Sequence, residues 1–271
     1  MRGPMTSTAR SARSPDIDVN AAPGLMPAPI CPRCSTRNTV DSAFCRACGA
    51  ALPSGSKSAG KPKVSIRVVR ADGGPEIVVA MGGQELTCGA RGDIPLEDDP
   101  FVAATQARFF FTGRRLAVED VGGGNGIFLR LHQERELTTG GELRLGRQRL
   151  LLEPVPALTP GAGGAMVWGS PDVGYRFRLI QILEGGARGA AFLLRDGENL
   201  LGRESGDVTF PNDGFVSGRH AVLQVRQDRL FVRDVGSSNG TFFRLFAPTA
   251  LDNGDHLLIG RELLRVEVSE R

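Results

Sequence analysis

An internal repeat is the feature that most constrains the fold of this chain. Residues 101–131 align with residues 215–245, and residues 137–153 align with residues 251–267, both at an offset of 114 positions. The clearest match pairs the sequence VEDVGGGNG in the first half with VRDVGSSNG in the second. A match that keeps one register over this length indicates a single fold used twice.

Each copy is expected to consist of short β-strands, because turn signals interrupt its apolar segments at close intervals. The chain contains 36 glycines and 17 prolines, which favours turns over long helices. In the second copy the breaks include Gly185-Gly186, Asp196-Gly197 and Asn253-Gly254. This rhythm predicts an all-β protein with two antiparallel β-sandwiches. The strands expected in the second copy are residues 175–183, 191–194, 199–203, 220–226, 230–233 and 263–268.

Four of the five cysteines form two closely spaced pairs, which is typical of a metal site. The pairs are Cys31 with Cys34 and Cys45 with Cys48, and ten residues separate them. Four thiolates on two tight turns can close a tetrahedron around Zn²⁺. Two disulfides or a redox dithiol are the alternatives, but a secretory signal and a surrounding βαβ pattern are missing. We therefore expect structural Zn²⁺, which would supply the folding free energy of a segment with few apolar side chains.

The stretch CPRCSTRNTVDSAFCRACGAAL around these cysteines resembles the short bacterial zinc-ribbon family. The likeness includes Phe44 before the third cysteine and Gly49 after the fourth. It implies a structural site without an open coordination position, and hence no metal catalysis. The fifth cysteine, Cys88, lies in an apolar strand pattern and is expected to be a small core residue.

Charge is distributed unevenly along the chain. Residues 1–63 contain nine Lys or Arg and three Asp, a net charge of +6, whereas the remainder has a net charge of −3. A nucleic acid would meet this basic arm rather than the body, and the alternative is a solvated, disordered tail. No apolar run approaches the roughly 18 residues of a membrane helix, and the start lacks the apolar core of a signal peptide. A cytoplasmic protein is therefore expected.

These observations predict six consecutive regions. One segment rich in Gly, Ala and Pro separates the two copies, and another segment of turn-forming residues follows the cysteines, so both are expected to be linkers. The predicted regions are a disordered arm at 1–28, a zinc ribbon at 29–52, a linker at 53–63, a first sandwich at 64–154, a linker at 155–172 and a second sandwich at 173–271.

Three loops of the second copy carry clusters of polar residues, and loops at one end of a sandwich can converge. The clusters are Gly202-Arg203-Glu204, Ser217-Gly218-Arg219-His220 and Ser237-Ser238-Asn239-Gly240-Thr241. In this order, and with the ending LDNGDHLLIG, they resemble the forkhead-associated (FHA) domain family over roughly residues 175–270. The resemblance implies a β-sandwich that binds phosphothreonine peptides in Ser/Thr kinase signalling, in a bacterium.

The residue types in these loops suit a phosphate dianion. The Arg203 guanidinium can donate charge-assisted hydrogen bonds worth about 1.5–3 kcal/mol each. Ser217 adds a hydroxyl donor, and a loop containing Gly218 lets backbone N–H groups approach. By resemblance, Asn239 would hydrogen-bond the peptide backbone next to the phosphorylated residue, and Ser238 would help to frame the site. The family often has a basic residue where this chain has Gly218; here the charge falls on Arg219, which we count among the ligand-binding candidates.

His220 could also be interpreted as a catalytic base together with Ser217 and Asp234. A histidine that opens a strand is more often a structural support, and the resembling family uses this position structurally. No Gly-x-Ser-x-Gly nucleophile motif accompanies it. We therefore expect His220, with Gly202 and Gly240, to support the site, and we expect no enzymatic activity.

The first copy lacks most of these polar residues. The positions of Arg203, Ser217, His220 and Ser238 are occupied there by Ala90, Ala103, Gln106 and Gly124, whereas Asn125 matches Asn239. A phosphate would lose the guanidinium and the hydroxyl. We predict that the first copy is a degenerate FHA-like domain that does not bind phosphothreonine, even though Arg91 lies beside the position of the missing arginine. Its expected role is to serve as a scaffold or to pack against the other copy.

The sequence supports one main function and an alternative. The main hypothesis is an adaptor whose second sandwich docks a phosphothreonine-containing protein, a Ser/Thr kinase or its substrate. The alternative is a nucleic-acid-associated regulator that uses the zinc ribbon and the basic arm. A third hypothesis is self-recognition, in which phosphorylated Thr6 or Thr8 of the arm is captured by the second sandwich, because a tether raises the effective concentration.

Overall fold

The computed structural model describes residues 30, 31, 33, 34, 36, 47, 48, 62–70, 73–171 and 173–269. The chain divides into two compact units, residues 1–60 and residues 61–271. The predicted arm at 1–28 and most of the predicted linker at 53–63 lie outside the described residues. Regular structure in the described residues consists of twenty β-strands and two short 3-10 helices, so the all-β prediction is confirmed. No helix in this part of the chain is long and apolar enough to cross a membrane.

The first half of the second unit contributes ten strands, joined by connections of two to eleven residues. They are β1 (Lys63–Val69), β2 (Ile77–Ala80), β3 (Glu85–Gly89), β4 (Ile94–Pro95), β5 (Ala107–Thr112), β6 (Arg115–Asp120), β7 (Ile127–Arg130), β8 (Arg135–Glu136), β9 (Glu142–Leu145) and β10 (Gln148–Pro154).

The second half contributes ten further strands, and each of the six strands expected there from the sequence is present with small shifts at its ends. The elements are η1 (Ala162–Gly164), β11 (Phe177–Ile182), η2 (Glu184–Gly186), β12 (Arg188–Leu194), β13 (Gly197–Gly202), β14 (Val208–Thr209), β15 (Ala221–Arg226), β16 (Arg229–Asp234), β17 (Thr241–Leu245), β18 (Thr249–Leu251), β19 (His256–Ile259) and β20 (Glu262–Ser269).

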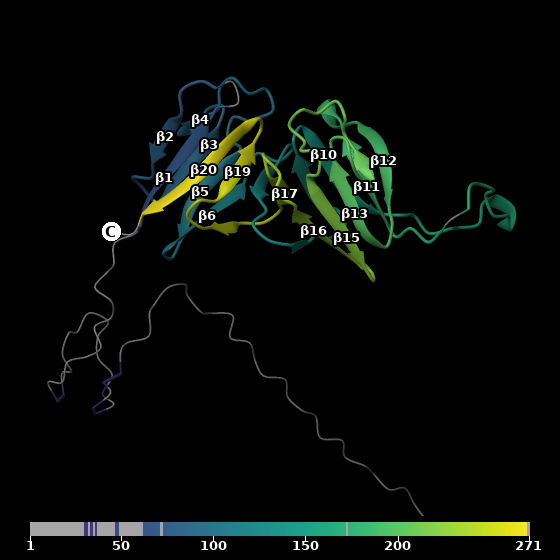
Figure 1. The fold of residues 1–271 in the computed structure, drawn as a ribbon. Helices are drawn as coiled ribbons and strands as arrows, with labels where there is room; N and C mark the ends of the chain where they lie inside the picture. Colours follow the sequence, from purple (N-terminus) through teal and green to yellow (C-terminus); the bar gives the residue numbers. More distant parts are fainter. Residues whose placement is uncertain are drawn as a thin grey trace, which may run out of the picture. The chain divides into compact units, whose positions relative to one another are not determined.

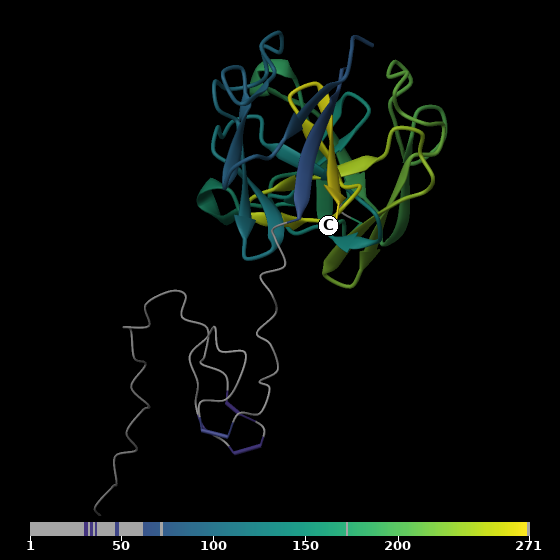
Figure 2. The ribbon, with the colours of Figure 1, turned by 90° about the vertical axis from the view of Figure 1, so that its left-hand side faces the viewer.

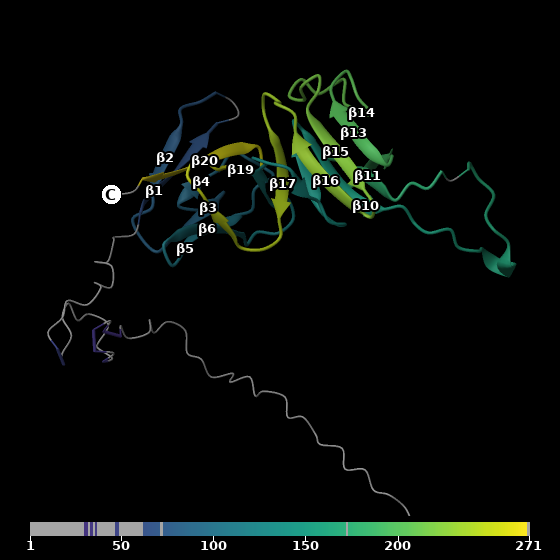
Figure 3. The ribbon, with the colours of Figure 1, turned by 60° about the horizontal axis from the view of Figure 1, so that its bottom comes forward.

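One ten-stranded sheet runs through both halves in the order β12-β11-β10-β9-β17-β7-β19-β20-β1-β2. Its centre is the antiparallel pair β7 and β17, in which Phe128 lies opposite Arg244 and Arg130 opposite Phe242. These four residues are two pairs at the repeat offset of 114, so the centre of the sheet relates the two halves by an approximate twofold axis. Figures 1 and 3 show β17 between a lobe that contains β1 and β20 and a lobe that contains β10 and β11.

The two halves exchange their last three strands. β1 pairs along its whole length with β20, from Lys63 opposite Ser269 to Val69 opposite Leu263, and Figure 2 shows the two strands side by side. β10 pairs instead with β11. The smaller sheets show the same exchange, because β8 joins β14-β13-β15-β16 and β18 joins β6-β5-β3-β4. Each lobe is therefore completed by strands from the other half of the chain.

This strand pairing crosses the boundary that the sequence suggests between a sandwich at 64–154 and a sandwich at 173–271. The predicted linker at 155–172 contains no strand in its described residues. It belongs to the long loop of a hairpin, because the strands on either side, β10 and β11, pair antiparallel. The Val155 N–H donates to the Arg176 carbonyl oxygen over 2.9 Å, which ties the two ends of the loop together. The segment thus connects two neighbouring strands.

The exchanged strands contribute equivalent side chains to one continuous hydrophobic core. Their inward-facing residues are fully buried in both copies, and each such aliphatic side chain contributes about 1.5–3 kcal/mol to stability. The four pairs at the repeat offset are Leu143 and Leu257, Leu145 and Ile259, Leu150 and Leu264, and Leu152 and Val266. Cys88 on β3 is also fully buried, as predicted, and its burial raises the pKa of the thiol to about 12.

Ion pairs fasten the exchanged strands to their new lobes. Arg226 on β15 donates two hydrogen bonds, of 2.9 and 3.1 Å, to the carboxylate of Glu134 beside β8. Arg229 Nε lies 2.9 Å from Glu136 on β8. At the central β17 strand, Arg244 pairs with Glu142 of β9 over 2.7 Å, and both side chains are largely buried. A geometry with two parallel bonds, or with little solvent, makes these pairs stronger than ordinary surface pairs.

Candidate functional site

The three polar loops of the second half meet and are hydrogen-bonded to each other. The Arg203 N–H donates to the Ser217 carbonyl oxygen over 2.9 Å. The Ser238 N–H donates to Ser217 Oγ over 3.1 Å. Asn239 Nδ2 donates to the carbonyl oxygen of Phe215 over 2.8 Å. The loops that carry Arg203, Ser217 and Asn239 are therefore tied together at one end of the lobe.

His220 holds two of these loops together from below. Its side chain is fully buried, and its Nδ1 accepts a hydrogen bond of 3.0 Å from the Ser217 N–H. Nε2 must therefore carry the proton of the neutral ring, which it donates to the Gly240 carbonyl oxygen over 3.1 Å. Burial lowers the pKa of His220 below its ordinary value, although the bond to Gly240 opposes this shift. Because both ring nitrogens are used, His220 positions Ser217.

Asp234, at the end of β16, organises the loop that carries Ser238 and Asn239. Its carboxylate accepts hydrogen bonds from Ser237 Oγ over 2.6 Å and from Thr241 Oγ1 over 2.7 Å. Burial, the largest single influence, raises the pKa of Asp234, but the hydrogen bonds from Ser237, Thr241 and the Gly236 N–H together outweigh it and lower the pKa. Sequence reasoning gave Asp234 no structural role. The signal was present, since an Asp followed by Gly and Ser favours a side-chain-capped turn.

Close backbone contact explains one glycine of the site. A Cβ atom at Gly202 would lie only 2.1 Å from the carbonyl oxygen of Gly218, so a side chain at Gly202 would push the two loops apart. Gly240 has a φ of 85°, in the left-handed region that favours glycine, and its N–H donates to Ser237 Oγ over 2.9 Å. Gly202 and Gly240 are both buried.

The groups that could contact a ligand lie at the surface. Arg219, Ser238 and Asn239 are exposed, whereas Arg203, Ser217 and Gly218 are half-buried. Arg203 Nε is 3.0 Å from the carboxylate of its neighbour Glu204, an exposed pair that a stronger anion can replace. The three loops that meet here thus carry two guanidinium groups, two hydroxyls and one side-chain amide. Such a set can bind a dianion and fix a peptide beside it.

A second loop cluster in the first half has the same backbone frame without these side chains. The Ala90 N–H donates to the Ala103 carbonyl oxygen over 3.0 Å, and the Ala103 N–H donates to Gln106 Oε1 over 3.2 Å. Asn125 Nδ2 donates to the Phe101 carbonyl oxygen over 2.9 Å. Arg91 is exposed, and its N–H donates to the Ala104 carbonyl oxygen over 2.9 Å. No hydroxyl or guanidinium stands at positions 103 and 90.

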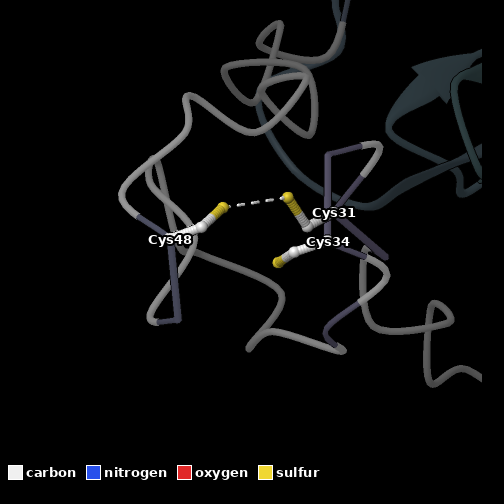
Figure 4. A group of neighbouring side chains, drawn as sticks. All are labelled: Cys31, Cys34 and Cys48. Carbon is white, nitrogen blue, oxygen red and sulfur yellow. Dashed lines mark hydrogen bonds between the residues drawn. The ribbon is translucent and has the colours of Figure 1, made fainter.

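Three of the four predicted metal ligands lie close together. The sulfurs of Cys31, Cys34 and Cys48 all lie within 4.8 Å of one another, and Cys45 lies outside the described residues. Figure 4 shows the three side chains pointing toward a common space. The Cys31 and Cys48 sulfurs are 3.7 Å apart, which excludes a disulfide bond of about 2.05 Å between them. The same 3.7 Å distance fits the sulfur–sulfur edge of a ZnS₄ tetrahedron, which is about 3.8 Å for Zn–S bonds of about 2.3 Å.

Comparisons with known proteins give one family. A family model described as FHA domain matches residues 199–260. FHA domain-containing protein FhaB of Mycobacterium tuberculosis is 35% identical over 65 residues, which are 24% of this chain and 42% of that protein. The oxoglutarate dehydrogenase inhibitor of Corynebacterium efficiens is 33% identical over 104 residues, which are 37% of this chain and 73% of that protein.

Solved structures are also matched. One, from a structural and functional analysis of phosphothreonine-dependent FHA domain interactions, is 26% identical, covers 29% of this chain and 84% of that chain, and has a TM-score of 0.19. The chain spans about two fifths of the length of FhaB, but nearly three quarters of the inhibitor. Because the match to the inhibitor extends over 73% of that protein and the family model also matches, this chain belongs to the family of FHA domain-containing proteins, with its FHA domain at residues 199–260.

Proposed function

We propose that this chain is an adaptor in Ser/Thr kinase signalling, whose FHA domain binds a phosphothreonine-containing protein, a kinase or its substrate. The observation that carries the proposal is the set of hydrogen bonds joining the Arg203, Ser217 and Asn239 loops at one surface. A threonine phosphate offers three acceptor oxygens and nearly two negative charges, which match these donors. The protein acts by holding its ligand, without catalysis.

Each ligand-binding residue has a defined task in this proposal. The Arg203 guanidinium leaves Glu204 and donates to the phosphate, because a dianion attracts it more strongly than one exposed carboxylate. Ser217 donates its hydroxyl, and Gly218 and Arg219 supply a backbone N–H and a second cation from the same loop. Asn239 keeps one N–H on Phe215 and uses its remaining N–H and Oδ1 for the peptide backbone, while Ser238 frames the phosphate.

The first half has a different task. We infer that residues of the first half form a degenerate FHA-like copy that keeps the backbone frame and does not bind phosphothreonine. Ala90 and Ala103 cannot donate to a phosphate. Arg149 Nη1 also donates to Asn125 Oδ1 over 3.3 Å, which occupies the atom that a peptide would need. This copy therefore serves as a scaffold for the functional lobe.

We further propose that Cys31, Cys34, Cys45 and Cys48 hold one structural Zn²⁺ as a zinc ribbon. The three described sulfurs and the 3.7 Å spacing of Cys31 and Cys48 support this donor set. The Arg33 N–H donates to Cys31 Sγ over 3.4 Å, as expected for a thiolate that needs orientation. Thiolate ligands also suit a reducing compartment, and we place the protein in the cytoplasm. Metal analysis of the purified chain should give one zinc per chain, and Cys48→Ser should lose it.

Paired threonine peptides with and without phosphate test the main proposal when titrated into the full-length chain. The phosphorylated peptide should bind and the unphosphorylated one should not. Asn239→Ala should weaken binding by about tenfold, or about 1.4 kcal/mol, because two uncharged hydrogen bonds to the peptide backbone are lost. The matched control is Asn125→Ala, which removes the same bond to a loop carbonyl in the first half and should leave affinity unchanged. Equal affinity for both peptides contradicts the proposal.

A further inference from the structure

The strand exchange brings a turn from the first half against the FHA site. Gly146 and Arg147 form the tight turn between β9 and β10. The carboxylate of Asp213, four residues before Ser217, accepts hydrogen bonds from the Arg147 N–H over 2.8 Å and from Gln148 Nε2 over 2.7 Å. A Cβ atom at Gly146 would lie 2.8 Å from Val216, so the turn touches the loop directly. The loop that carries Ser217 is therefore braced by residues outside the matched domain at 199–260.

This contact places a cation beside the peptide clamp. The Arg147 guanidinium lies 4.8 Å from the centre of the Phe215 ring. Phe215 is 49% exposed, and its carbonyl oxygen accepts the hydrogen bond from Asn239. Arg147 itself is exposed and forms no ion pair with any described residue. Asn239, the exposed Phe215 ring and the Arg147 guanidinium thus lie in succession.

The other lobe contains a twin of this arrangement. Arg261 lies at the repeat offset from Arg147, and its guanidinium is 4.6 Å from the centre of the Phe101 ring. Its N–H donates to the carboxylate of Asp99. The carbonyl oxygen of Phe101 accepts from Asn125. Without the exchange, Arg261 would accompany the FHA site and Arg147 would accompany the inactive cluster.

We propose that the FHA ligand site is composite, and that Arg147 from the first half binds an acidic side chain close to the phosphothreonine. The inference deepens the proposed function and depends on it. An extended peptide advances about 3.3 Å per residue, so side chains within a few positions of the one held by Asn239 can reach Arg147. A guanidinium stacked on a ring keeps its N–H edge free for a carboxylate. The preferred ligands are therefore phosphothreonine segments with flanking Asp or Glu.

Fluorescence anisotropy on the full-length chain can test this with two phosphothreonine peptides, one flanked on both sides by aspartates and one by alanines. The wild type should prefer the acidic peptide. Arg147→Ala should weaken binding of the acidic peptide by about fivefold, the upper range for an exposed ion pair, and should hardly affect the alanine peptide. Arg261→Ala should change neither. Arg147→Glu should reverse the preference and favour a lysine-flanked peptide, which loss of a merely structural residue would not do.

The alternative outcomes are distinct. A loss of acidic preference in Arg261→Ala, with Arg147→Ala unchanged, would show that the two halves are not exchanged, and it overturns the composite site. No effect of either variant overturns the role of Arg147. If Arg203→Ala abolishes binding of both peptides while Arg147→Ala changes nothing, the proposed function stands and this inference fails. If the wild type ignores the phosphate, the proposed function itself fails, and the inference with it.

Discussion

The two loop clusters of this protein share a backbone frame and differ in the side chains placed on it. In both clusters, the first residue after the third strand of the copy donates its N–H to a loop carbonyl oxygen, that of Ala103 or Ser217. An asparagine side chain then donates to the carbonyl oxygen two residues before that acceptor, in Phe101 or Phe215. The second cluster has the guanidinium of Arg203 and the hydroxyl of Ser217, whereas the first cluster has alanines at both corresponding positions. The backbone hydrogen bonds of the cluster are thus kept without the ligand-binding side chains, so the two features can be changed independently.

The asparagines show the same contrast. Both Asn125 and Asn239 use one N–H to hold a neighbouring loop, at 2.9 and 2.8 Å. The Oδ1 atom of Asn125 accepts from Arg149, whereas no described residue donates to Oδ1 of Asn239. Leu263 stands at the repeat position of Arg149, and it has no donor to offer. A ligand therefore finds a ready acceptor in one cluster and an occupied one in the other.

The largest expected effect is on affinity and comes from Arg203. Arg203→Ala should weaken phosphopeptide binding by about 3 kcal/mol, or about 100-fold, because two charge-assisted hydrogen bonds are lost. Arg91→Ala, beside the empty position in the first half, should have no effect. Isothermal titration of both variants measures the difference. A comparable loss in Arg91→Ala would show that the first cluster binds phosphate as well.

A smaller effect, on stability, should be shared by both clusters. A Cβ atom at Gly202 would lie 2.1 Å from the Gly218 carbonyl oxygen, and one at Gly89 would lie 2.5 Å from that of Ala104. Gly202→Ala and Gly89→Ala should each cost about 2 kcal/mol, because the backbone must move to relieve the overlap. Thermal unfolding would detect both, and only Gly202→Ala should also weaken peptide binding. An unchanged melting temperature in either variant would argue against a shared frame.

A weaker gain of function should follow when the missing chemistry is restored. Ala90→Arg combined with Ala103→Ser gives the first cluster its two donors, but Arg149 still occupies Asn125 Oδ1. Adding Arg149→Leu, the residue of the repeat position, should release that atom. We expect two peptides per chain in calorimetry only for the triple variant, with the second site weaker than the first. Full binding to the double variant would show that the Arg149 contact is irrelevant.

The smallest effect is a pH dependence that distinguishes His220 from Gln106. Burial lowers the pKa of His220 from an ordinary value of 6.5, so below about pH 6.5 the unfolded chain binds more protons than the folded one. The free energy of unfolding should therefore decrease as pH falls through this window. His220→Gln, which copies Gln106, should reduce the dependence. It should not abolish it, because burial also lowers the pKa of His256. Denaturant unfolding at several pH values between 7.5 and about 5 measures the free energy of unfolding. If this free energy falls with pH as steeply in His220→Gln as in the wild type, the role given to His220 is contradicted.

Local sequence patterns determined much of this protein. Turn signals and apolar segments predicted short strands and an all-β chain, because these depend on residues close together in the sequence. The order of the three polar motifs was enough to predict that the loops of Arg203, Ser217 and Asn239 lie together, since loops at one end of a sandwich converge. The contributions of Asp234 and Phe215 were missed, because their roles are hydrogen bonds to the loops rather than contacts with a ligand.

Only the tertiary structure decided which strands complete which lobe. Strands β8–β10 and β18–β20 match at the repeat offset and bury equivalent aliphatic residues, so either set can fill either place with nearly the same apolar burial. The difference lies in contacts between distant residues. Glu134 and Glu136 meet Arg226 and Arg229 in the exchanged arrangement, whereas the repeat positions of the two glutamates are Pro248 and Ala250, which offer no charge. Such a preference depends on pairs about 90 residues apart, and no local pattern in the chain could reveal it.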